Sequence, residues 1–76
     1  MLDITVIQAI LDDWDEGEIT RNELKYKYNV DIVTIYIIIA CSKDKSVQEI
    51  EIMLSKITPT MTYNEIEVII GRKVYL

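Results

Sequence analysis

Hydrophobic residues recur at intervals of three and four along most of the chain, which is the spacing of one face of a helix. Acidic residues crowd the end of the first such segment, where negative charge opposes the helix dipole, and Gly17 follows them. We therefore expect a first helix from Asp3 to about Trp14. Its hydrophobic stripe consists of Val6, Ile7, Ile10, Leu11 and Trp14.

A second helix is predicted to begin after Thr20. The Thr20 hydroxyl can accept a hydrogen bond from the backbone of Glu23, whose carboxylate can reach back, and this reciprocal pair is a capping box. Ile19 and Leu24 have the spacing of a hydrophobic staple. Asn29 tolerates the left-handed conformation that ends many helices, so we expect the chain to turn there.

The stretch after this turn is almost wholly apolar and allows two interpretations. Asp31 can cap a helix that runs from about Ile32 to Ser42. Alternatively, residues 31–41 form a buried strand, because they are rich in β-branched side chains and a continuous apolar run has no diagnostic period. The preceding turn and cap favour the helix, and the strand stays open as the alternative.

Two further helices are predicted in the second half of the chain. Ser46 and Glu49 can form another capping box, and the stripe that follows is ended by Pro59. The hydrophobic stripe of the helix after Ser46, the fourth in the chain, consists of Val47, Ile50, Met53, Leu54 and Ile57. Thr62 and Glu65 can form a third capping box, which repeats the pattern around Thr20, with Gly71 in the place of Asn29.

These elements predict an all-α fold, a small bundle of four to five short helices that forms one domain over residues 1–76. If residues 31–41 are a buried strand, the fold is α+β instead.

The segment around the turn resembles the helix-turn-helix DNA-binding family, in particular small phage and prokaryotic regulators. The residues that carry the resemblance are Asn29, Val30, Asp31, Thr34, Ile35, Tyr36 and Ile38. It implies that the helix after the turn enters the major groove of double-stranded DNA, and that the protein binds as a dimer. Lys25 departs from the pattern, because the family prefers a small residue there so that the two helices can pack closely.

Charge is unevenly distributed along the chain. The net charge is −5, whereas DNA-binding surfaces are usually basic. The first nineteen residues carry a charge of −6 and the others +1, so any DNA contact should lie beyond residue 19. The candidate DNA-binding residues are Arg21, Lys25, Lys27, Thr34, Tyr36, Lys43 and Lys45.

The helix after the turn is also unusually apolar for a DNA reader, since base edges are read mainly by polar side chains. An exposed apolar helix face usually marks a protein contact. The alternative function is therefore an acidic, non-enzymatic interaction module, such as a phage-like inhibitor or adaptor, that binds a second copy or a protein partner. Its contact face would consist of Ile32, Val33, Tyr36 and Ile37.

Residues suited to catalysis or metal binding are scarce. The chain has no histidine, two glycines and a single cysteine, so we expect no enzyme activity, no metal and no cofactor. Cys41 is expected to be a small buried hydrophobic residue. The longest apolar run is too short to span a membrane and no basic signal segment is evident, so we expect a cytoplasmic location, that of the host cell if the protein is viral.

Overall fold

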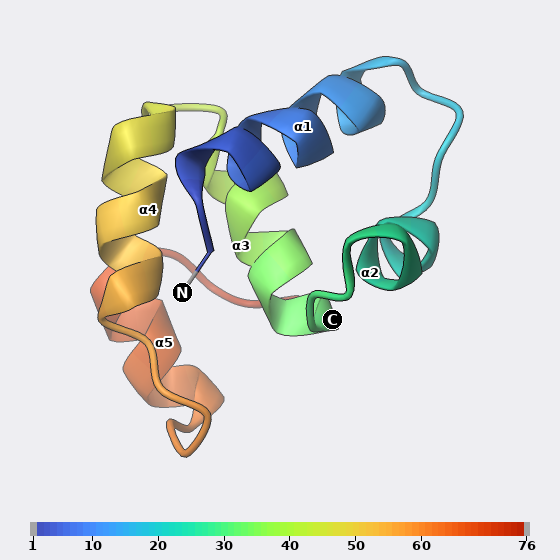
Figure 1. The fold of residues 1–76 in the computed structure, drawn as a ribbon. Coiled ribbons are helices and arrows are strands. Elements are labelled where there is room, and N and C mark those ends of the chain that lie inside the picture. Colours follow the sequence, from blue (N-terminus) through green and yellow to red (C-terminus); the bar gives the residue numbers. More distant parts are fainter. Residues whose placement is uncertain (1, 76) are drawn as a thin grey trace.

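The computed structural model describes residues 2–75 and contains five helices in that range (Figure 1). They are α1 (Ile4–Asp15), α2 (Arg21–Tyr28), α3 (Ile32–Cys41), α4 (Val47–Ser55) and α5 (Tyr63–Ile70). The all-α prediction is therefore confirmed. The first helix extends one residue beyond the expected Trp14, and Gly17, at a φ of 79°, lies in the break after it.

Side-chain caps explain where the helices begin. Each of the five is preceded by a residue whose side chain accepts a backbone N–H of the first turn, which satisfies a donor that has no partner within the helix. All three expected capping boxes form, at Thr20, Ser46 and Thr62. Asp3 caps α1 in the same way, as Asp31 does for α3. Local sequence chemistry thus sets the starts of all five helices.

Two helices end in the same left-handed conformation. Asn29 has φ 54° and ψ 49° after α2, and Gly71 has φ 74° and ψ 22° after α5. The Val30 N–H donates to the Lys25 carbonyl, which closes the end of α2. Helices α2 and α5 are both eight residues long, begin with a threonine capping box and end at a left-handed residue. The sequence similarity between them therefore corresponds to the same local structure.

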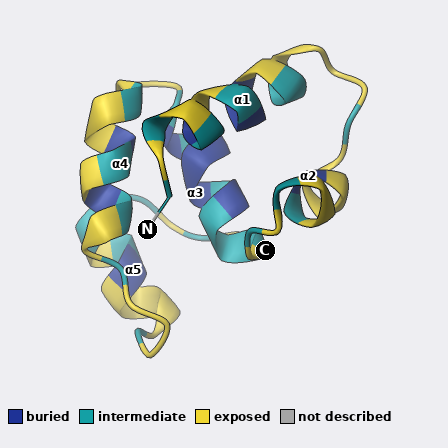
Figure 2. Cartoon of the chain, viewed as in Figure 1, coloured by how far each residue is buried: buried dark blue, intermediate teal, exposed yellow. Residues whose placement is uncertain are grey.

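The strand alternative for residues 31–41 is wrong, because this segment is helix α3. The β-branched residues that suggested a strand are tolerated in the helix since α3 is packed on several sides. It packs against α1, α2 and α4, and its ribbon shows only buried and partly buried residues in Figure 2. Burial of so many side chains outweighs the modest helix propensity of isoleucine and valine.

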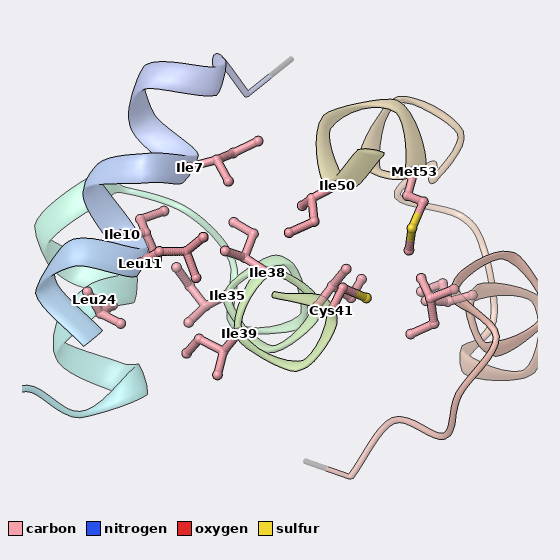
Figure 3. Close-up of a cluster of buried hydrophobic side chains, with 13 residues drawn as sticks. Ile7, Ile10, Leu11, Leu24, Ile35, Ile38, Ile39, Cys41, Ile50 and Met53 are labelled. Carbon is pink, nitrogen blue, oxygen red and sulfur yellow. The ribbon is translucent and has the colours of Figure 1, made fainter. Parts of the chain in front are cut away.

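Isoleucine dominates the core around α3. Figure 3 shows Ile38 of α3 pointing into the space between α1 and α4, with Ile10 on one side and Ile50 on the other. All three side chains are fully buried. No polar or charged residue among residues 2–75 is buried to the same degree, so the core is held by apolar packing around a central helix. Its members are Ile7, Ile10, Leu11, Leu24, Ile35, Ile37, Ile38, Ile39, Cys41, Ile50, Met53, Ile66 and Ile70.

The C-terminal helix is attached differently from the other four. Among the described residues, α5 does not pack closely along its length against any single helix. It is held instead by Ile66 and Ile70, which reach the core, and by the segment that follows it. That segment, residues 72–75, runs back across α3 and is called the tail below (Figure 1).

Candidate interaction surface

The α2–turn–α3 segment has the local geometry expected from its sequence. The Thr20 hydroxyl accepts the Glu23 N–H at 3.1 Å, and the Glu23 carboxylate accepts the Thr20 N–H at 3.0 Å. After the turn at Asn29, the Asp31 carboxylate accepts the Thr34 N–H at 2.9 Å. The two capped helices α2 and α3 therefore meet at a tight corner formed by the left-handed residue Asn29.

The outer face of α3 is less open than the sequence suggested. None of its residues is fully exposed in the structure. Ile37 is 0% exposed, so its expected place on a solvent-facing contact surface is wrong. The reason is that α3 lies at the centre of the bundle, where other elements cover most of its circumference. Ile32, Val33, Thr34 and Tyr36 are partly exposed and remain available for contact.

Several candidate DNA-binding residues are engaged within the protein. The Arg21 guanidinium lies 5.4 Å from the Trp14 ring centroid and 5.8 Å from that of Tyr36, within cation–π range. The Tyr36 hydroxyl donates to the Lys73 carbonyl at 3.2 Å. Arg21 and Tyr36 were both expected to contact DNA. In the structure they instead connect α1, α2, α3 and the tail.

Lys27 takes part in a cluster that joins α1 to α2. Its ammonium lies 2.7 Å from Asp13 Oδ2, and the Tyr28 hydroxyl donates to the same oxygen at 2.6 Å. Hydrogen bonds from Lys27 and Tyr28 lower the pKa of Asp13. The bond to Asp13 in turn raises the pKa of Lys27 and that of Tyr28. The positive charge of Lys27 is thus matched by an adjacent carboxylate.

The remaining basic candidates lie on different elements. Lys25 is partly buried, and its ammonium lies 5.2 Å from the ring centroid of Tyr26. Lys43 and Lys45 follow α3 in the connector to α4, at the opposite end of α3 from the turn. The structure therefore places these residues at both ends of α3 and does not gather them along the helix.

A cleft of about 660 Å³ opens beside the start of α3. Its walls come from the turn before α3 and its first residues, the end of α4, the connector between α4 and α5, and the first turns of α5. We call this the apolar cleft, because most of the side chains that line it are hydrophobic. It is lined by Leu2, Asn29, Val30, Asp31, Val33, Thr34, Leu54, Ile57, Thr58, Pro59, Met61, Tyr63 and Ile66.

Only one residue of the expected protein interface, Val33, lines the apolar cleft. The other contributors come from segments far away in sequence, including Leu54, Met61 and Tyr63. The predicted stripe of the fourth helix and the predicted capping box at Thr62 placed Leu54 on an inward face and Met61 and Tyr63 at the start of a helix. They did not show that the three segments would leave a space between them.

Three features of the described residues bear on other functions. Residues 2–75 contain no group of three side chains placed to hold a metal ion. Cys41 is fully buried as expected, and burial raises the pKa of its thiol. None of the five described helices combines the length and apolar character needed to cross a membrane.

Comparisons with protein-family models, with curated proteins and with solved structures find no match to this chain. The resemblance to the helix-turn-helix family therefore depends on the residues around Asn29 alone.

Proposed function

We propose that the protein is a non-enzymatic protein–protein interaction module that uses the apolar cleft as its docking surface. The observation that carries this proposal is the cleft itself. Its volume is within the range of pockets that enclose ligands, and its walls are mainly hydrophobic. Burial of such walls by a partner removes apolar surface from water, which is the main favourable contribution to protein association.

The lining indicates the chemistry of the partner. Among residues 2–75, Asp31 is the only charged residue that lines the cleft, and the chain as a whole carries a charge of −5. A partner with apolar side chains and a nearby lysine or arginine is complementary to both features. Met61 is flexible enough to adapt to different side chains, and Tyr63, 52% exposed, is an aromatic anchor at the rim. An amphipathic helix with a basic edge fits this surface.

A defined peptide tests the proposal. Isotope-labelled protein is titrated with a synthetic helix built from leucine and lysine, with leucines spaced to form one stripe. We expect chemical-shift changes at Val33, Met61 and Tyr63. A peptide of the same composition with its leucines distributed around the helix should bind at least about tenfold more weakly, since it cannot place a continuous apolar face in a groove.

Tyr63 and Tyr26 provide a matched pair of variants. Both are exposed tyrosines on short helices, but only Tyr63 lines the cleft. Tyr63→Ala should weaken binding of the peptide with one leucine stripe, here called the striped peptide, and Tyr26→Ala should leave that binding unchanged. Equal effects of the two substitutions, or shift changes that avoid the cleft, would contradict the proposal. Concentration-dependent shifts at the cleft without peptide would identify a second copy of the chain as the occupant.

We propose DNA binding as the second candidate function, because of the capped α2–turn–α3 corner. Its support is weaker, since Arg21 and Lys27 make internal contacts and no residue of α3 is fully exposed. In the proposed complex with DNA, Lys43 and Lys45 contact phosphates from the connector after α3, and Thr34 and Tyr36 are the residues of α3 nearest to the bases. The protein would bind as a dimer, as the family does.

Titration with a pool of duplex DNA at low salt tests this candidate. Phosphate contacts release counterions, so the affinity for DNA should fall steeply as the salt concentration rises. Replacement of both Lys43 and Lys45 should reduce the slope of the logarithm of the binding constant against the logarithm of the salt concentration by about two. Binding that is absent at low salt, or insensitive to Lys43→Ala with Lys45→Ala, would rule out this use of the connector.

A further inference from the structure

The tail is attached to α3 mainly through Arg72. The Arg72 guanidinium donates one hydrogen bond to the Ala40 carbonyl and another, at 2.9 Å, to Asp44 Oδ1. Ala40 lies in the last turn of α3, where carbonyls have no partner within the helix and the helix dipole favours a positive charge. Arg72 thus completes the end of α3 from a segment that follows α5.

Two more hydrogen bonds hold the tail in place. The Lys73 carbonyl accepts the Tyr36 hydroxyl, and the Val74 N–H donates to Glu67 Oε2 at 2.8 Å. Val74 also packs against the core. The tail therefore connects the end of α5 to the middle and the end of α3, and it covers part of the face that α3 would otherwise present to solvent.

The same tail limits the position of one wall of the apolar cleft. Tyr63 and Ile66 of α5 line the cleft, and α5 lacks close packing along its length with any other helix in residues 2–75. Its attachment therefore depends on Ile66 and Ile70 at the core and on the contacts that Arg72, Lys73 and Val74 make beyond its end. Release of Arg72 removes the only ion pair among these contacts of the described chain.

Arg72 also has a feature that favours release. Its Nε–H is buried and finds no acceptor among the described residues. Water supplies that hydrogen bond when the side chain is exposed, so the attached arrangement carries a cost that the released one does not. The ion pair with Asp44 is partly exposed and is weakened by salt.

We propose that Arg72 acts as a clasp that holds α5 and the tail against α3, and that its release opens the apolar cleft to a partner. The second half of this inference depends on the docking function proposed above, whereas the first half does not. A partner that binds the open arrangement more tightly shifts the population toward it.

Amide hydrogen exchange followed by NMR tests the clasp on the free protein. Arg72→Gln removes the charge and both guanidinium hydrogen bonds, to Ala40 and to Asp44. Lys73→Gln is the matched control, because the Lys73 side chain is exposed and only its backbone carbonyl is used. We expect Arg72→Gln to accelerate exchange about tenfold or more in α5 and the last turn of α3, as loss of a charged hydrogen bond implies. Exchange in α1 and α2 should stay as slow as in the unmodified protein.

The outcomes separate the clasp from the docking function. Unchanged exchange in Arg72→Gln, uniform acceleration in all helices, or an equal effect of Lys73→Gln would overturn the clasp. If exchange accelerates only in α5 and the last turn of α3, the peptide with one leucine stripe should bind Arg72→Gln about tenfold more tightly than the unmodified protein, because it no longer has to open the clasp. If Arg72→Gln releases α5 and the tail but the peptide binds neither this variant nor the unmodified protein, the clasp is supported and the docking function is rejected. Equal peptide affinity for both forms would reject control of the cleft by Arg72.

Discussion

The central position of α3 predicts a graded loss of stability when Ile38 is shortened. Ile38 is fully buried between α1 and α4. Removal of one methylene in Ile38→Val should cost about 1 kcal/mol, and Ile38→Ala about 4 kcal/mol, because the surrounding helices can only partly fill the space that is left. A chain of this length is stable by only roughly 4 to 11 kcal/mol, so the alanine variant should lie near the limit of folding.

Urea denaturation followed by circular dichroism measures these losses. With a denaturant dependence of about 1 kcal/mol per molar, the urea midpoint should fall by about 1 M for Ile38→Val and by about 4 M for Ile38→Ala. Ile52→Ala is the control, since Ile52 is 55% exposed on α4, and it should change stability by less than about 0.5 kcal/mol. If Ile38→Ala and Ile52→Ala lower the midpoint equally, α3 is not the centre of the core.

Two further predictions concern the turn and acid stability. Asn29→Ala should destabilise the protein by about 1 kcal/mol in thermal melts and Asn29→Gly by much less, because glycine and asparagine accept the left-handed conformation readily. Equal losses in the two variants, or a similar loss in the control Asn22→Ala within α2, would contradict this. The pKa of Asp13 is lowered in the folded state, so the unfolded state binds more protons as the pH falls from the ordinary value of 3.8 through the folded pKa. The stabilisation from Asp13 should be complete above pH 3.8 and lost as the pH falls through the folded pKa. Asp13→Asn should flatten the acid side of the melting profile, and an unchanged profile for this variant would refute the cluster.

The helix boundaries were predictable because they depend on local chemistry. A capping box needs only a hydroxyl and a glutamate three residues later, and the left-handed turn needs only a residue such as Asn29. These interactions join neighbours in the sequence, so the chain reveals them without its tertiary structure. The starts after Thr20, Ser46 and Thr62 are confirmed for this reason.

The exposure of α3 was not predictable in the same way. A helix that is apolar on all sides has no polar face to show which side meets solvent. Ile37 was therefore placed on the contact surface, whereas it is in the core. The coverage of α3 by the tail depends on contacts between Arg72 and Ala40, which are 32 positions apart. The apolar cleft has the same origin, since its walls meet only when α3, α4 and α5 assemble.

The burial of Cys41 determines how the protein meets oxidants. Disulfide exchange requires an accessible thiolate, and this thiol is covered by the core and has a raised pKa. Two folded copies should therefore not become linked through Cys41 during handling in air. A thiol reagent can reach the sulfur only while the structure around the end of α3 is open, so the rate of its reaction reports how often that opening occurs.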